Sequence, residues 1–326
     1  MKRAFLILSS LIFLFACGPK EKVEEVSYRL KWLYNVSAVG DLYADVYGYF
    51  AKNGLKVNVK PGGPERDALK ELELGHAQFG VASADQVFRA VAKGAPIVVL
   101  AQLFQVNPLH WIYRPNKTTF KSAEDLKGKT IGVTFGGNDE TIMRAILARY
   151  AITENEVSLF SVRYDYTPFY EGRVAFWPLY LNAQAVIIGE KLDRAGEKYA
   201  FVSPDALGVR FVANSVVTTR EMLEKHPDTV KRFLGALHQG WQDALDPQNE
   251  EKAVQVLAQL DRETPAAVVR RQLPVTRALM LPAAGATFGK IDLEAWKQTA
   301  EIMAAQQLIP AQLNVESVLM TDLIKY

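Results

Sequence analysis

The chain has 326 residues, of which 49% are apolar and 23% are charged, and its formal net charge is +2. This composition is typical of a folded globular protein, and the small net charge gives no reason to expect a nucleic-acid partner. Behind an N-terminal leader about 300 residues remain, a length that favours two compact lobes over a single core.

The N-terminus predicts a secretory signal over residues 1–16, because two basic residues precede an apolar run from Ala4 to Ala16. That run is shorter than the roughly 20 residues that a membrane-spanning helix needs. It ends in Leu14-Phe15-Ala16-Cys17, which is similar to a bacterial lipobox, although Phe15 is bulkier than usual there. We expect cleavage before Cys17 and a lipid on that cysteine, with an incidental cysteine as the alternative.

Cys17 is the only cysteine, so the mature chain has no disulfide and no thiolate metal site. Residues 17–26 are mostly polar and predict a tether. No further apolar segment is long enough to span a membrane. We therefore expect an exported monomer that is held at the membrane through the lipid alone, with no metal and no cofactor.

Apolar alternation and helical spacing follow one another along the chain. Strands are expected at 28–33, 55–59, 77–82 and 97–104, with helices at 41–53, 65–74 and 84–92 between them. The pattern starts again with strands at 130–134, 159–164, 174–176 and 184–188, a helix at 139–150 and a further strand within 208–219. Strands separated by helices indicate parallel sheets that are covered on both faces.

The predicted fold class is therefore α/β and bilobed, with extended crossings near 105–114 and 206–214 that act as a hinge. Lobe 1 is predicted to span 27–112 plus 212–326, and lobe 2 to span 113–211. Ligands in such sheets bind beyond the carboxyl ends of the strands, so we expect a ligand cleft between the lobes.

Ordered sequence blocks then resemble a known family. The segments are Trp32-Leu33-Tyr34-Asn35, Gly48-Tyr49-Phe50-Ala51-Lys52-Asn53-Gly54-Leu55, Phe79-Gly80-Val81-Ala82, Tyr180-Leu181-Asn182 and Ala213-Asn214-Ser215. They resemble the thiamine-pyrimidine-precursor binding family, a branch of the type II periplasmic binding proteins that also include sulfonate and nitrate binders. The resemblance implies a solute-binding protein of an ABC importer, with permease and ATPase subunits as partners and no enzymatic activity.

One position departs from the family pattern, because Ala38 stands where the pyrimidine binders usually have a histidine. A small aromatic heterocycle, such as a thiamine pyrimidine precursor, riboflavin or a related ring, is the expected ligand. A sulfonate or nitrate-type anion is the alternative. A pyrimidine-synthesising enzyme is a further alternative, but the cysteine-rich motif of the resembling fungal enzymes is absent from the mature chain.

Several residues at predicted strand ends are candidates for ligand binding. Trp32 could stack on a ring and Asn35 could read its polar edge, while a core tryptophan and a turn-forming asparagine are the alternatives. Asp85 and Gln86 follow Ser83 at a helix start, where capping is equally plausible. The corresponding corner of lobe 2 carries Gly136, Gly137 and Asn138, for which a plain glycine turn is the alternative. The resemblance adds Tyr180 and Asn182.

Overall fold

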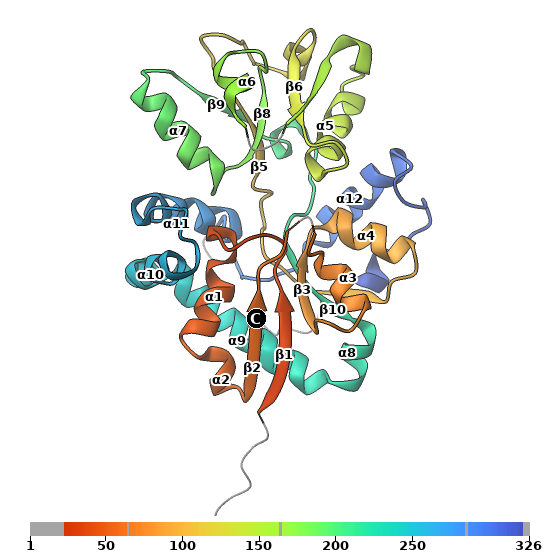
Figure 1. Cartoon of the computed structure of the whole chain (residues 1–326). Helices are drawn as coiled ribbons and strands as arrows, with labels where there is room; N and C mark the ends of the chain where they lie inside the picture. The colour runs from red at the N-terminus through yellow and green to blue at the C-terminus, as the bar shows by residue number, and fades with distance from the viewer. Residues whose placement is uncertain (1–22, 64, 163–164, 284–285, 322–326) are drawn as a thin grey trace, which may run out of the picture.

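The computed structural model describes residues 23–63, 65–162, 165–283 and 286–321. Two lobes lie one above the other, and extended chain segments join them in the middle (Figure 1). The predicted signal at 1–16 and Cys17 lie outside the described residues. The predicted tether at 17–26 is wrong at its end, because the first strand already begins at Glu24.

Lobe 1 contains a five-stranded sheet of order β2-β1-β3-β10-β4. Its strands are β1 (Glu24–Arg29), β2 (Leu55–Lys60), β3 (Phe79–Ala82), β4 (Ile97–Gln102) and β10 (Ser215–Thr219). The sheet is parallel as expected except for β10, which runs antiparallel to both of its neighbours. The cause is topological, since β10 is the strand on which the chain returns from lobe 2.

Lobe 2 contains the sheets β8-β5-β9 and β6-β7, which meet at a parallel bridge between Ile131 and Phe176. Its strands are β5 (Leu109–Tyr113), β6 (Thr130–Val133), β7 (Ser158–Ser161), β8 (Trp177–Tyr180) and β9 (Ala200–Val202). Because β5 pairs with β8 and β9, residues 109–112 belong to lobe 2 and not to lobe 1. The predicted boundary at 112 falls inside a strand that the sequence analysis took for part of a crossing.

Helices cover the sheets of both lobes (Figure 1). In lobe 1 they are α1 (Val39–Val46), α2 (Tyr49–Lys52), α3 (Ala68–Glu73), α4 (Ala84–Ala92), α8 (Arg220–Lys225), α9 (Pro227–Leu245), α10 (Glu250–Leu260), α11 (Ala266–Met280) and α12 (Leu293–Ala305). In lobe 2 they are α5 (Asn138–Arg149), α6 (Thr167–Tyr170) and α7 (Gln184–Arg194). Short 3-10 helices include η1 (Val36–Ala38) before α1.

The start of α7 was predicted as a strand at 184–188, and this prediction is wrong. The apolar run Ala185 to Ile188 reads as a short buried strand, but its buried positions recur at helical spacing through Gly189 and Leu192. Gly189 is required there, since a Cβ would lie 2.6 Å from the Tyr199 hydroxyl oxygen. The helical spacing of the buried positions, which extends beyond residue 188, is what distinguishes this segment from a strand.

Helix α9 is central to the core of lobe 1 and packs against one face of the sheet. The Phe233 ring of α9 stacks on Phe79 with ring centroids 3.7 Å apart, and it meets Tyr28 edge-on at 5.0 Å. Helix α1 packs on α9 through a glycine at each side of the contact. A Cβ at Gly40 would lie 2.0 Å from the Trp241 ring, and one at Gly240 would lie 2.5 Å from the side chain of Ala44.

Gly40→Ala should therefore lower the free energy of unfolding by about 3 kcal/mol, because neither the Trp241 ring nor the helix backbone has room to move. Urea unfolding measures this. Gly235→Ala is the matched control on α9, where a Cβ meets no atom within 4 Å. The control should be neutral or stabilising by about 0.5 kcal/mol. Equal effects of the two substitutions would contradict the close packing at Gly40.

Candidate functional site

The strand directions bring particular loops to the gap between the lobes. In lobe 1, parallel β1, β3 and β4 end at the gap, and antiparallel β10 begins there. In lobe 2, β5 leads away from the gap, so its antiparallel partner β8 returns toward it. Strand β6 runs parallel to the segment before β8 and also ends at the gap. The loops that the sequence analysis placed at a cleft are therefore on facing edges of the two lobes.

A small cavity of about 20 Å³ lies at the lobe 1 side of this gap. We call it the anchor cavity; apart from apolar side chains, it is lined by Lys31, Trp32, Asn35, Ser37, Asp41 and Asn214. Trp32 is 39% exposed, so the core alternative for this residue is wrong. Ala38, which departs from the family pattern, also lines the cavity, and its small side chain leaves space there.

Asp41 is the buried acid of the anchor cavity. It lies in the first turn of α1, is 1% exposed and accepts a 2.5 Å hydrogen bond from the Tyr28 hydroxyl. Burial raises the pKa of the Asp41 carboxyl to about 7, while the hydrogen bond from the Tyr28 hydroxyl holds it below a still higher value. The carboxyl thus changes charge near neutral pH at the edge of the cleft.

Three asparagines at the gap keep a buried polar atom without a partner among the described residues. They are Asn138 through its Nδ2, and Asn182 and Asn214 through their Oδ1 atoms. Asn138 begins α5, Asn182 follows β8 and Asn214 precedes β10. A buried amide atom without a hydrogen bond is costly, so such atoms indicate a missing ligand or water.

The predicted corner at α4 forms hydrogen bonds within its own turn. The Ser83 hydroxyl donates to Asp85 Oδ1 at 2.5 Å, and the Ser83 amide donates to Gln86 Oε1 at 3.1 Å. Asp85 is buried and Gln86 is half-buried. The structure brings both residues to the gap, in the capping arrangement that was their alternative, and their ligand role stays a prediction.

At the start of α5 in lobe 2, backbone amides also donate hydrogen bonds to side chains of the same turn. The Thr134 amide donates to Asp139 at 2.6 Å, and the Gly136 amide donates to Glu140 at 2.7 Å. A Cβ at Gly137 would lie 2.5 Å from the Asp139 carboxylate. Gly136 and Gly137 therefore form a tight turn in which the Gly136 amide binds a carboxylate and the Gly137 amide donates to the Thr134 carbonyl at 2.7 Å. This arrangement does not favour an anion at the helix N-terminus.

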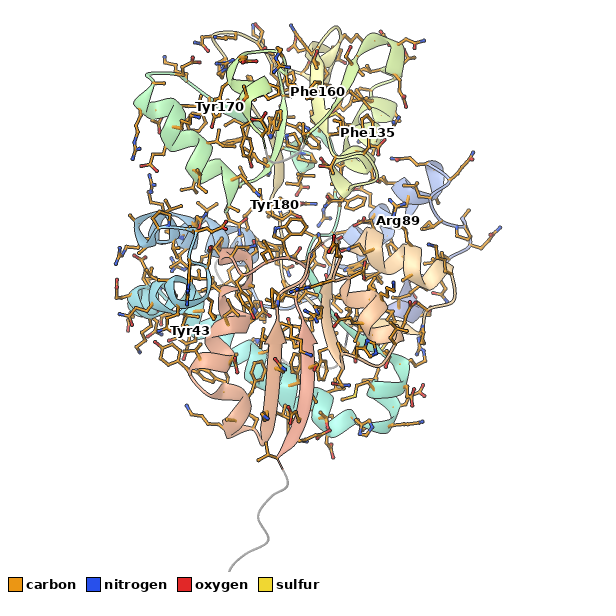
Figure 2. All side chains as sticks on the ribbon, viewed as in Figure 1. Tyr43, Arg89, Phe135, Phe160, Tyr170 and Tyr180 are labelled. Atoms are coloured by element: carbon orange, nitrogen blue, oxygen red, sulfur yellow. The ribbon has the colours of Figure 1, made fainter. Side chains whose placement is uncertain are left out.

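The two remaining candidates lie on opposite sides of the gap. Asn35 lines the anchor cavity, but its side chain accepts from the Ser37 amide at 2.8 Å and donates to the Leu33 carbonyl at 3.0 Å. Tyr180 is half-buried at the end of β8, and Figure 2 shows it between the lobes. No hydrogen bond of its hydroxyl is present in the described part of the chain.

Asn182 belongs to a set of contacts that joins lobe 2 to η1 and α11 of lobe 1, and we call this set the clasp. Asn182 Nδ2 donates to the hydroxyls of Ser37 at 3.0 Å and Thr276 at 3.2 Å. Next to it, the Gln272 amide donates to the Ala183 carbonyl at 3.2 Å. Further along the two helices, Arg271 pairs with Glu190. The clasp thus ties the lobes together on the α7 side of the gap.

The other side of the gap is tied by α12. The Gln306 amide, just beyond α12, donates to the Thr141 carbonyl of α5 at 2.9 Å. One apolar cluster includes Trp296 and Met303 of α12 together with Ile142 of α5, so apolar packing continues from one lobe to the other. The two crossings are also bonded to each other, since the Asn107 amide donates to the Phe211 carbonyl at 2.7 Å.

Sequence reasoning missed Asp41 and Asn214 as members of the site. A signal existed for both: Asp41 is an acid within an otherwise apolar stretch, and Asn214 is a polar residue that opens an apolar strand. Phe135 was also missed. It is 52% exposed and lies on the edge of lobe 2 that faces the gap (Figure 2).

Within the described ranges, no cluster of three or more His, Cys, Asp or Glu side chains is arranged to hold a metal ion. None of the helices described here is both long and apolar enough to cross a membrane.

Asp41 makes stability depend on pH. Because its folded pKa lies above the usual value, the unfolded chain ionises first, and stability should fall as pH rises from about 4 to 7 and then level off. In Asp41→Asn this part of the pH dependence should vanish. The melting temperature of the variant minus that of the natural chain should rise over that window, as scanning calorimetry can measure. A difference that stays constant with pH would contradict the raised pKa.

Comparisons with known proteins agree with this geometry. The family model described as NMT1/THI5 like matches residues 35–251. The riboflavin-binding protein RibY of Chloroflexus aurantiacus is 23% identical over 327 residues, which covers 95% of this chain and 88% of that protein. The formylaminopyrimidine-binding protein of Halalkalibacterium halodurans is 22% identical over 303 residues, covering 90% of each chain.

Among solved structures, the periplasmic aliphatic sulphonate binding protein SsuA of Escherichia coli superposes with a TM-score of 0.72 at 16% identity. The match covers 92% of this chain and 98% of that one, and at this identity it bears on the fold alone. The bilobed architecture is accordingly the type II periplasmic-binding-protein fold, as predicted. Since the family model matches more than half of its residues, the chain belongs to the NMT1/THI5-like family.

Proposed function

We propose that this protein is the solute-binding component of an ABC importer and captures a small aromatic heterocycle between its lobes. The observation that carries the proposal is the set of unpaired polar atoms on Asn138, Asn182 and Asn214. They come from lobe 2 and from the start of β10, and they converge on the gap at which Trp32 is exposed. A flat ring with polar edges would stack on Trp32 and supply hydrogen-bond partners for these amide atoms.

The family relatives support a ligand of this class, since the proteins named above bind riboflavin and formylaminopyrimidine by their descriptions. The side chains that line the gap also support a heterocyclic ligand. Ligand recognition in such a site needs an aromatic surface and a few convergent polar groups, and the gap supplies both.

An anion such as a sulfonate or nitrate is a second candidate, and two cations favour it. Lys31 lines the anchor cavity, and Arg89 lies on α4 near the gap (Figure 2). Neither forms a hydrogen bond or an ion pair within the described part of the chain. Against the anion, the helix starts at the gap are occupied by Asp85 and Asp139, and Asp41 faces the cavity. An anion there would meet carboxylates at close range.

Trp32→Ala should reduce the affinity about tenfold or more, because stacking and buried ring area are both lost. The compound to use is the small molecule that co-purifies with the protein, identified by mass spectrometry and then titrated by calorimetry. The melting temperature should change little, since the Trp32 ring is exposed. A co-purified sulfonate, or an inorganic anion that binds with unchanged affinity to Trp32→Ala, would favour the second candidate.

The matched control is Leu74→Ala, which truncates an apolar side chain of 57% exposure away from the anchor cavity. It should leave both affinity and melting temperature unchanged. If Trp32→Ala lowers the melting temperature markedly while affinity is preserved, Trp32 does not belong to the site.

We further propose that the protein is exported and anchored by a lipid on Cys17. Cys17→Ala should lose partitioning into the detergent phase, because the lipid is the only membrane attachment in this proposal. Its affinity for the co-purified compound should equal that of the natural chain, since the described lobes begin after the cysteine. Membrane association that survives the substitution would refute the anchor.

A further inference from the structure

The anchor cavity is too small to hold a whole ligand. Its volume of about 20 Å³ is enough for one water-sized group. Trp32 lies at this cavity and is exposed, so a ring that stacks on Trp32 would direct one substituent into the cavity. The chemistry of the cavity wall then decides which substituent is accepted.

That wall presents hydrogen-bond acceptors. Asn214 is 7% exposed, and its Oδ1 is unpaired among the described residues. The Asp41 carboxyl is fixed in place by the Tyr28 hydroxyl, which leaves other lone pairs for a further donor. Among the donors of the wall, the Asn35 amide is engaged, because it donates to the Leu33 carbonyl. Lys31 is the one cation of the lining, and no acid pairs with it among the described residues.

We propose that the ligand inserts one small hydrogen-bond-donating substituent, a primary amino group, into the anchor cavity, where Asp41 and Asn214 accept its two N–H groups. Asp41 is then the residue that selects the substituent. The inference rests on the proposed function and deepens it, since it states which edge of the heterocycle enters lobe 1.

Three consequences follow from size and charge. A methyl group has the volume of an amino group but leaves both acceptors unpaired, so it should bind more weakly. A dimethylamino group has no N–H and exceeds the cavity. An anionic substituent would meet the Asp41 carboxyl directly and should be excluded.

The experiment compares 4-aminopyrimidine, 4-methylpyrimidine and 4-(dimethylamino)pyrimidine by calorimetric titration of the mature chain, freed of co-purified ligand, at a pH of about 8, where Asp41 is ionised. We expect the amino probe to bind about tenfold more tightly than the methyl probe and the dimethylamino probe to bind least. In Asp41→Asn the preference for amino over methyl should fall to about threefold or less. Asn214→Ala should reduce it by a smaller factor, and the Oδ1 that this variant removes has no partner among the described residues.

Asp45→Asn is the matched control, because Asp45 lies one turn further along α1 and is exposed. It should keep the full preference. The proposal is overturned if the natural chain binds amino and methyl probes equally, if Asp41→Asn and Asn214→Ala both retain the preference, or if the amino probe fails to bind at about 10 mM. Equal binding that still depends on Trp32 would remove the anchor while leaving the proposed function intact. A co-purified sulfonate would instead remove the proposed function.

Discussion

The hydrogen bond from Tyr28 to Asp41 connects the core of lobe 1 with its ligand-binding edge. Tyr28 belongs to the aromatic cluster around Phe233, and Asp41 faces the anchor cavity. Next to Asp41, Gly40 lets the Trp241 ring lie against α1. A carboxyl with an ionisation cost of this kind weakens the fold near neutral pH. A buried acid with a raised pKa at the cleft fits the general observation that side chains with shifted pKa values cluster at functional sites.

Contacts between the two lobes limit how the lobes can move relative to each other. The crossings are bonded to each other, and α12 packs against α5, so that side has the character of a hinge. The clasp on the α7 side is different, because it consists of a few polar contacts and one partly exposed ion pair between Glu190 and Arg271. The ion pair adds little in water, whereas the Asn182–Thr276 hydrogen bond is buried. Opening on that side would give a ligand access to Trp32 and the unpaired amides.

Much of this arrangement could be predicted from the sequence, and the errors have physical causes. The alternation of strands and helices was sufficient for the α/β class. Trp32, Asp85 and Asn138 follow strands that end at the gap, and their role in binding stays a prediction. The reversal of β10 could not be predicted from periodicity, since an antiparallel and a parallel buried strand have the same apolar pattern. Residues 184–188 were misassigned because a short apolar run does not by itself distinguish a strand from a helix face.

The site residues that were missed required knowledge of contacts between distant segments. Asp41 matters because Tyr28 and Trp241 surround it, and neither partner is adjacent in sequence. Asn35 was rightly placed at the cavity, but which of its amide atoms stay available depends on the local turn, which engages both.

The polar groups that remain available determine what the cleft can recognise. At the start of α4 the Ser83 amide donates to the Gln86 side-chain oxygen, and at the start of α5 the Thr134 amide donates to the Asp139 carboxylate, so these two amides are not available to a ligand. Recognition then depends on side-chain amides and on the Asp41 carboxyl, together with the exposed rings of Trp32 and Phe135 on opposite edges of the gap. Exposing two apolar rings to water is unfavourable, and a flat ligand that covers both would gain free energy by removing their surface from water. The way each helix begins thus supports our proposal of a neutral or weakly basic ring over a compact anion.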